Sequence, residues 1–247
     1  MHSDSTTIHI GTSGYQYAHW RGRFYPDDLP KSKWLTHYAQ SFQTLEINST
    51  FYGLPETETV RHWKEQTPPG FLFALKFSRY GSHTKCLKNP EQTVSTFMDC
   101  AEELKSAAGP VLVQLKPNWH CNPERLEHFL KALPPSVRWA FEFRDESWLC
   151  EEIYSLLKTH NAAMVIHDML DDHPDVETAD WSYYRFHGDH YSGHYSPQFL
   201  SAFAGRLVER SRSGREQFVY FNNDAEGCAV DDALKLKRYL NKRPAQA

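Results

Sequence analysis

The sequence of 247 residues lacks long apolar runs, and no window approaches the roughly 18 apolar residues that a membrane-spanning helix needs. Residues 1–7 also lack the basic stretch and apolar stretch of a secretory signal. No charge of one sign dominates, because 27 Lys and Arg stand against 31 Asp and Glu. We therefore expect a cytoplasmic protein that binds no membrane, and the sequence leaves its oligomeric state open.

Cysteines are few and widely spaced. The five cysteines form no C-x-x-C pair, so the spacing of a zinc knuckle, an iron–sulfur cluster or a disulfide framework is missing. The Gly-rich nucleotide-binding patterns, G-x-S-x-G and H-E-x-x-H are absent too. His187, His190 and His194 have spacings that a metal site could use, but the glycines between them predict a mobile loop. We expect no metal and no cofactor.

What the sequence does contain is eight short apolar runs that each end in, or are followed directly by, a polar or charged residue. The runs are 8–11, 44–48, 72–76, 111–115, 139–143, 163–166, 183–186 and 218–221. Apolar residues at helical spacing predict helices at 33–42, 57–66, 90–108, 123–133, 147–160, 197–211 and 231–240. Parallel strands need such crossovers, so the alternation predicts an α/β fold, a (β/α)₈ TIM-type barrel.

The barrel is expected to be a single domain over 1–247, with short tails at 1–7 and 244–247. The sixth and seventh runs start at residues 163 and 183, which leaves room for a short helix or none between them. The residues before two predicted helices, Asn122 and Ser196, are followed by proline, a typical helix start.

Polar side chains at the strand ends predict the site. Residues two apart share a face of a strand, and the C-terminal strand ends form the active-site rim of this fold. The residues expected to face the barrel lumen are Glu46 with Asn48, Lys76, Gln114 with Lys116, Glu142 with Arg144, either His167 or Asp168, and Arg185 with His187. Cations exceed carboxylates in this set, which suits an anionic ligand.

Roles can be assigned to these residues. Glu142 is expected to act as the acid/base, because a carboxylate in a lumen can be tuned toward neutral pH, with Glu46 and Lys76 as further catalytic groups. The expected substrate-binding residues are Asn48, Gln114, Arg144, Asp168, Arg185 and His187. The alternative is a layer of salt bridges that only stabilises the barrel. In that case the expected pairs are Glu142 with Arg185, Glu46 with Lys76, and Asp168 with Arg144.

A series of ordered segments resembles the YecE-like proteins, a family known as a domain of unknown function. The segments are Gly11-Thr-Ser-Gly14, Glu46-Ile-Asn-Ser-Thr-Phe-Tyr52, Phe73-Ala-Leu-Lys76 with Ser82-His83, Leu112-Val-Gln-Leu115, Phe141-Glu-Phe-Arg144 with Ser147-Trp148, Arg185-Phe-His-Gly188 and Tyr220-Phe-Asn-Asn223. The resemblance covers nearly the whole chain and implies a TIM-type barrel, but it implies no reaction. It adds His83, Asn222 and Asn223 to the motif positions, the last two as substrate-binding residues. This chain departs from the family at Lys116 and Asp145, where Pro and His are more usual.

The sequence favours a metal-independent enzyme, of hydrolase or lyase type, that acts on an anionic small molecule containing a phosphate or a sugar. Two carboxylates would permit a glycosidase, and Lys76 would permit a Schiff base if its pKa were lowered, which neighbouring carboxylates would oppose. A nucleic-acid binding or processing protein, with rim cations on phosphates, is an alternative that we do not favour. A non-catalytic ligand-binding protein is the other alternative.

Overall fold

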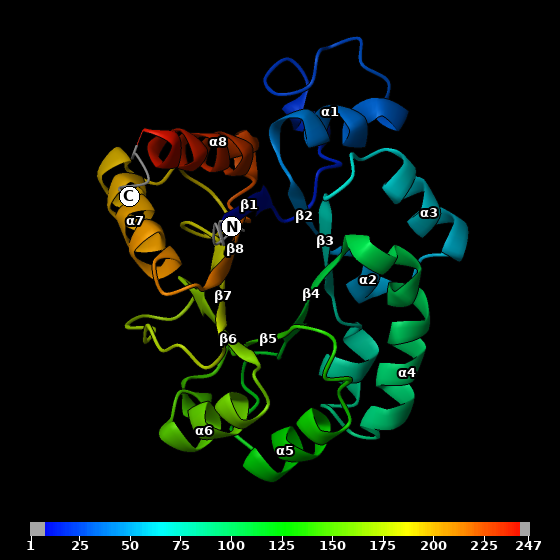
Figure 1. The fold of residues 1–247 in the computed structure, drawn as a ribbon, viewed down its shortest axis with the longest axis vertical. Coiled ribbons are helices and arrows are strands. Elements are labelled where there is room, and N and C mark those ends of the chain that lie inside the picture. The colour runs from blue at the N-terminus through cyan, green and yellow to red at the C-terminus, as the bar shows by residue number, and fades with distance from the viewer. Residues whose placement is uncertain (1–7, 243–247) are drawn as a thin grey trace, which may run out of the picture.

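Eight parallel strands form a ring with the helices on its outside (Figure 1). The computed structural model describes residues 8–242, so the predicted tails at 1–7 and 244–247 lie outside the described residues. The strands are β1 Ile8–Thr12, β2 Thr44–Ile47, β3 Leu72–Lys76, β4 Ala108–Gln114, β5 Trp139–Glu142, β6 Ala163–His167, β7 Trp181–Phe186 and β8 Glu216–Phe221. Their order in the sheet is β1-β8-β7-β6-β5-β4-β3-β2. The predicted TIM-type barrel is confirmed.

Helices follow most strands. The α-helices are α1 Trp34–Ser41, α2 Ser49–Tyr52, α3 Thr57–Glu65, α4 Pro90–Ala101, α5 Pro123–Lys131, α6 Glu151–Thr159, α7 Pro197–Ser211 and α8 Cys228–Asn241. The short helical turns are η1 Ala18–Trp20, η2 Lys31–Lys33, η3 Tyr80–Thr84, η4 Glu102–Ala107, η5 Glu146–Trp148 and η6 Ala225–Gly227. Asn122 and Ser196 cap α5 and α7 through their side chains, as expected. Within residues 8–242 no helix joins β6 to β7, which agrees with the short spacing.

Three predicted helices have different bounds. The helix predicted at 90–108 ends at Ala101 and continues as the tighter turn η4, in which Lys105 has a left-handed φ of 52°. The helix predicted at 147–160 is divided, because Leu149 leaves the helical region between η5 and α6. The last helix begins at Cys228 rather than 231, after Gly227 with φ 74°. Backbone conformation at single residues, rather than apolar spacing, sets these ends.

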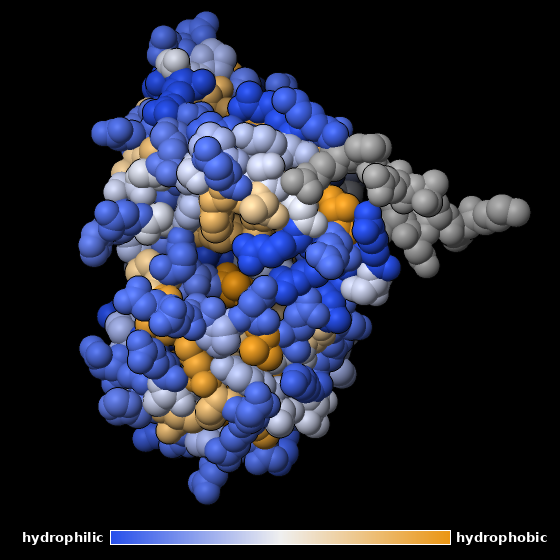
Figure 2. Space-filling view, turned by 90° about the vertical axis from the view of Figure 1, so that its left-hand side faces the viewer, coloured by the Kyte–Doolittle hydropathy of each residue, from blue (hydrophilic) through white to orange (hydrophobic). Residues whose placement is uncertain are grey.

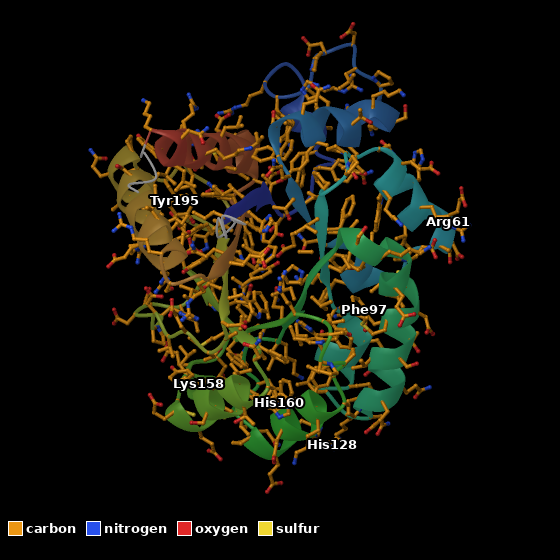
Figure 3. The ribbon with its side chains drawn as sticks, viewed as in Figure 1. Arg61, Phe97, His128, Lys158, His160 and Tyr195 are labelled. Atoms are coloured by element: carbon orange, nitrogen blue, oxygen red, sulfur yellow. The ribbon has the colours of Figure 1, made fainter. Side chains whose placement is uncertain are left out.

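The two faces of the strands bury different sets of side chains. One hydrophobic cluster fills the lumen and includes Ala74, Leu112, Val165, Tyr183 and Tyr220. The other packs the outer strand face on the helices and includes Leu45, Ile47, Phe141 and Phe143, as predicted. Figure 3 shows the side chains that fill the ring, whereas the labelled Arg61, His128 and Lys158 lie on the outer helices. At the C-terminal ends of the strands, polar residues continue the lumen face beyond this cluster.

The ring closes between β1 and β2, the two ends of the strand order. The N–H of Gly14 donates to the carbonyl of Glu46 at 2.8 Å. Lower in this seam the Tyr38 hydroxyl accepts from the N–H of Thr12 at 2.9 Å and lies 3.2 Å from the carbonyl of Thr44, to which it donates. A Cβ at Gly11 would lie 2.4 Å from that carbonyl oxygen. The seam therefore needs both a side-chain hydroxyl and a glycine.

The outer surface is polar on the side that carries α6 and α7. Figure 2 shows this side as mostly hydrophilic, with hydrophobic residues in small patches. None of the helices among the described residues is both long and apolar enough to cross a membrane.

Candidate active site

Arg185 lies at the centre of the barrel mouth and joins two carboxylates from distant strands. Its side chain is 1% exposed. Nη2 donates to Oε1 of Glu46 at 2.8 Å, and Nη1 donates to Oε2 of Glu142 at 2.5 Å. The ends of β2, β5 and β7 therefore meet here. The structure brings these three predicted site residues together.

Two neutral side chains also donate hydrogen bonds to the carboxylate of Glu46. Ser13 Oγ donates to its Oε1 at 2.6 Å, and Tyr183 OH donates to its Oε2 at 2.6 Å. With Arg185, three donors hold this fully buried carboxylate. The expected pair of Glu46 with Lys76 is wrong, because Glu46 bonds to Arg185 instead.

Glu142 binds two guanidiniums. Arg144 Nε donates to Oε1 of Glu142, and Arg185 occupies Oε2. Burial alone would raise the pKa of Glu142, but the positive charges of Arg185 and Arg144 outweigh burial and hold the pKa well below its usual value. A carboxylate that stays ionised so far into acid does not fit the acid/base role expected of it. Its position fits a group that holds and orients the guanidiniums.

His187 is oriented by Asp168. Asp168 Oδ1 lies 2.8 Å from the N–H of His187 and 3.0 Å from its Nδ1. Because Nδ1 then carries the proton, Nε2 accepts from Arg144 at 3.1 Å and Arg185 at 3.3 Å. Burial lowers the pKa of His187, which keeps the ring neutral. The expected pair of Asp168 with Arg144 is therefore wrong, and Asp168 acts through His187.

Asp168 is itself held from the loop after β7. The Tyr195 hydroxyl donates to Oδ2 of Asp168, and the N–H of Gly188 lies 3.1 Å from the same oxygen. Figure 3 places Tyr195 beside α7. Burial would raise the pKa of Asp168, but hydrogen bonds from His187 and Tyr195 outweigh it and lower the pKa. The carboxylate is thus kept ionised as the partner of His187.

His167 is the buried residue of the pair predicted after the sixth strand. Its Nδ1 accepts from the N–H of Met169 at 3.1 Å, so its Nε2 donates to the carbonyl of Phe143 at 2.7 Å. Burial lowers the pKa of His167 to about 4. This histidine is a neutral donor that fixes the end of β5.

Lys76 differs from the other charged groups of the mouth. Its ammonium lies 4.5 Å from the centre of the Phe51 ring, and no hydrogen bond or ion pair joins it to another residue within 8–242. Burial lowers its pKa to about 8, helped by the charge of Arg185, although Glu142 and Glu46 act in the opposite sense. The carboxylates oppose the lowered pKa of Lys76, as expected, but burial and the charge of Arg185 outweigh them.

His83, a motif position of the family, also contacts Phe51. Its ring contacts Phe51 edge-on at 4.9 Å between centroids. The Ser82 hydroxyl donates to the carbonyl of Ser78 at 2.9 Å, so it accepts from His83 Nδ1 at 2.9 Å. This leaves the lone pair on Nε2. Burial, assisted by Lys76, lowers the pKa of His83 to about 4.

The predicted amide side chains are placed differently from one another. Asn48 Oδ1 is buried without a hydrogen-bond partner among residues 8–242, as is Nε of Arg185. Gln114 and Asn222 are half-buried at the ends of β4 and β8. Asn223 is not joined to the network, because its Nδ2 donates to the carbonyl of Gly193 at 2.8 Å and to Asp232 at 3.0 Å.

Three side chains of the network were missed from the sequence, namely Ser13, Tyr183 and Tyr195. Ser13 and Tyr183 both hydrogen-bond to Glu46. Tyr183 lies two residues before Arg185 on β7, so the alternation rule that selected Arg185 already placed Tyr183 on the lumen face. Ser13 follows the end of β1 and lies within the segment Gly11-Thr-Ser-Gly14 of the family resemblance, which was the available signal for it.

The three histidines considered for a metal do not converge. His187 is bonded to Asp168, His190 is 97% exposed, and His194 Nδ1 lies 3.0 Å from Asp232. In the part of the chain that the structure describes, no three His, Cys, Asp or Glu side chains are grouped as metal ligands.

Comparison with known proteins gives the family. A family model described as protein of unknown function DUF72 matches residues 9–247. This chain belongs to the DUF72 family. The UPF0759 protein YunF of Bacillus subtilis is 24% identical over 270 residues and covers 95% of both chains. The UPF0759 protein YecE of Escherichia coli K12 is 31% identical over 145 residues, 57% of the DUF72 chain described here and 53% of YecE. The chain thus spans about half the length of YecE.

Solved structures agree with this assignment. A DUF72 family protein from Thermotoga maritima is 30% identical, with a TM-score of 0.86 over 95% of this chain and 99% of its own. The homocysteine methyltransferase MmuM from Escherichia coli is 14% identical with a TM-score of 0.50, which shows a shared fold alone. The resemblance to YecE-like proteins is confirmed, and the description of the family names no activity.

Proposed function

We propose that this DUF72 chain is an enzyme that binds an anionic small molecule in the barrel mouth. The ammonium of Lys76, which no carboxylate neutralises, carries the proposal. Glu46 and Glu142 are both occupied by guanidiniums. Burying a charge without a partner is costly, and an anionic ligand would supply the partner that Lys76 lacks.

Additional unpaired groups support an anion site. Arg144 uses Nε and Nη2 for Glu142 and His187, whereas its Nη1 has no hydrogen-bond partner within residues 8–242. The orphaned Nε of Arg185 and Oδ1 of Asn48 also need partners. Together with the ammonium of Lys76, these groups provide three donors and one acceptor. Such a set suits a phosphate or carboxylate on a molecule that also carries a hydroxyl group.

Lys76 is also the group to which we assign catalysis. Its pKa of about 8 allows it to gain and lose a proton near neutral pH, whereas Glu142 stays ionised. Perturbed pKa values are typical of active sites. We assign the acid/base role to Lys76 and give Glu142 and Glu46 the role of positioning Arg185. A reaction of hydrolase or lyase type in the cytoplasm fits this assignment.

The test is thermal unfolding with phosphate, sulfate, small carboxylates and sugar phosphates. A ligand at a hundred times its dissociation constant stabilises the native state by about 2.7 kcal/mol. We expect stabilisation of the wild-type protein and of Lys158→Met, an exposed control on α6, and a loss of it in Lys76→Met. An equal response of both variants to every anion would refute the site. Binding without turnover of any bound compound would favour the non-catalytic alternative.

Nucleic-acid binding is the second candidate because exposed aromatics lie beside the mouth. Tyr52 and Tyr80 are 82% and 54% exposed, and with Arg79 they line a pocket of about 380 Å³ that also includes Phe51. Unstacked bases bind such rings, and phosphates bind arginine. Affinity for a single-stranded oligonucleotide that falls steeply with added salt, and falls in Tyr52→Ala, would support this candidate. Absence of binding at low salt would remove it.

A further inference from the structure

We propose that Lys76 forms an imine with the carbonyl group of a substrate that also carries a carboxylate, a 2-oxo acid, because its unpaired amine lies beside the guanidinium-lined mouth. This inference rests on the proposed anion site. It names the substrate class of that site and makes Lys76 its nucleophile in place of the acid/base role.

The surroundings of Lys76 favour an amine that reacts rather than one that forms a salt bridge. The residue ends β3, and its carbonyl is fixed by the Thr50 hydroxyl at 2.7 Å. The Nζ atom lies against the Phe51 ring, at 4.5 Å, and no carboxylate lies within ion-pair distance of it in residues 8–242. The backbone is therefore held while the amine is left free to meet a ligand.

A useful fraction of this amine is uncharged. With a pKa of about 8, on the order of a quarter of Lys76 carries the lone pair at pH 7.5, compared with roughly one in a thousand for a lysine in water. Burial and neighbouring cations are the two arrangements by which proteins activate lysine as a nucleophile, and both are present here. The lowered pKa thus supports the geometric argument.

The carboxylate of the substrate has its own partner. Arg144 is one of the cations whose charge acts on Lys76, its side chain is 9% exposed, and its Nη1 is unpaired among the described residues. Glu142 and His187 fix the other two nitrogens of this guanidinium. A 2-oxo acid carries its carboxylate on the carbon next to the carbonyl carbon, so a carboxylate on Arg144 would bring the carbonyl toward Lys76.

The covalent step needs no oxidant or reductant. The Lys76 lone pair forms a bond to the carbonyl carbon, the nitrogen gives up one of its two protons, and the carbonyl oxygen takes up a proton, which gives a carbinolamine. The hydroxyl then takes up a second proton and leaves as water while the nitrogen lone pair forms the carbon–nitrogen double bond, which gives the protonated imine. His83 is a neutral group beside Phe51 with a free lone pair on Nε2, suited to accept the proton from nitrogen. A protonated imine withdraws electrons from adjacent bonds, which is the chemistry of a lyase.

The experiment is reductive trapping with pyruvate. The full chain is incubated with pyruvate and sodium borohydride, digested, and analysed by mass spectrometry for the reduced adduct at each lysine. We expect the adduct at Lys76 at least tenfold above Lys158, more with pyruvate than with acetone, and rising as the pH increases from 6.5 to 8.5. Lys76→Arg keeps the positive charge and should abolish the adduct, whereas Lys158→Arg should leave it unchanged.

The wild-type comparison of Lys76 with Lys158 decides the inference even if a variant folds poorly. Labelling of Lys76 no stronger than labelling of Lys158, or equal labelling with pyruvate and acetone, would overturn it. Phosphate separates the two proposals. If phosphate still raises the melting temperature of a protein that gives no adduct, the imine is refuted and the anion site stands. If no adduct forms and neither phosphate, sulfate nor a small carboxylate raises the melting temperature, both fail.

Discussion

Replacing Glu142 by Gln tests whether the charge network at the barrel mouth supports the fold. The wild-type carboxylate is fully buried and accepts from two guanidiniums, Arg185 and Arg144. Gln keeps the shape and one acceptor but removes the negative charge. Arg185 retains Glu46, whereas Arg144 is left with His187 alone. One positive charge then remains without compensation in a site from which water is largely excluded.

The magnitude follows from this imbalance. Removing one partner of a buried ion pair costs about 3–5 kcal/mol. For a chain of this size, each kcal/mol lowers the melting temperature by about 2 °C or somewhat more, so Glu142→Gln should melt about 6–10 °C below the wild type. The matched control is Glu146→Gln, an exposed glutamate on η5, which should change the melting temperature by about 1 °C or less.

Added anion makes the test sharper. Sulfate would compensate the charge left on Arg144, so it should stabilise Glu142→Gln more than it stabilises the wild type. Urea unfolding and thermal melts at pH 7.5, each with and without sulfate, measure both effects. If Glu142→Gln had the same melting temperature as the control Glu146→Gln, the charge network would not stabilise the barrel mouth. A large loss that sulfate leaves unchanged would refute the anion site while the salt-bridge layer remained.

Three further changes test the seam and a neutral histidine, all by urea unfolding. Gly11→Ala should destabilise the fold by about 1–3 kcal/mol, because the new Cβ would lie 2.4 Å from the carbonyl oxygen of Thr44. The control Gly53→Ala should be nearly neutral, because no atom lies within 4 Å of its new Cβ. Equal effects of the two substitutions would contradict the close approach of β1 and β2 at Gly11. Tyr38→Phe removes the hydroxyl between β1 and β2 and should cost about 1–3 kcal/mol, so wild-type stability would count against its bridging role. His167 has a folded pKa of about 4, below its ordinary value, so its stabilising effect is complete above about pH 6.5 and is lost as the pH falls through 4, by about 3 kcal/mol in total. His167→Gln should flatten this part of the pH dependence, and an unchanged slope would show that other groups cause it.

The sequence was sufficient for the architecture. All eight predicted strands occur within a few residues of their expected bounds, because alternating or continuous apolar residues and the lengths between them are local properties of the chain. The same alternation put Glu46, Glu142 and Arg185 on the lumen face, and the family resemblance agreed with these positions. Helix ends were less well predicted, since a single left-handed residue such as Lys105 decides them.

Only the tertiary structure decided which groups pair and what they can do. Glu46 and Arg185 are separated by 139 positions, and their contact depends on how two strands are placed across the ring. The pairing of both carboxylates with guanidiniums left Lys76 unpaired, and burial beside Arg185 then lowered its pKa to about 8. The chain supplies the types of charged groups, but protonation depends on burial and distance, which are properties of the folded barrel.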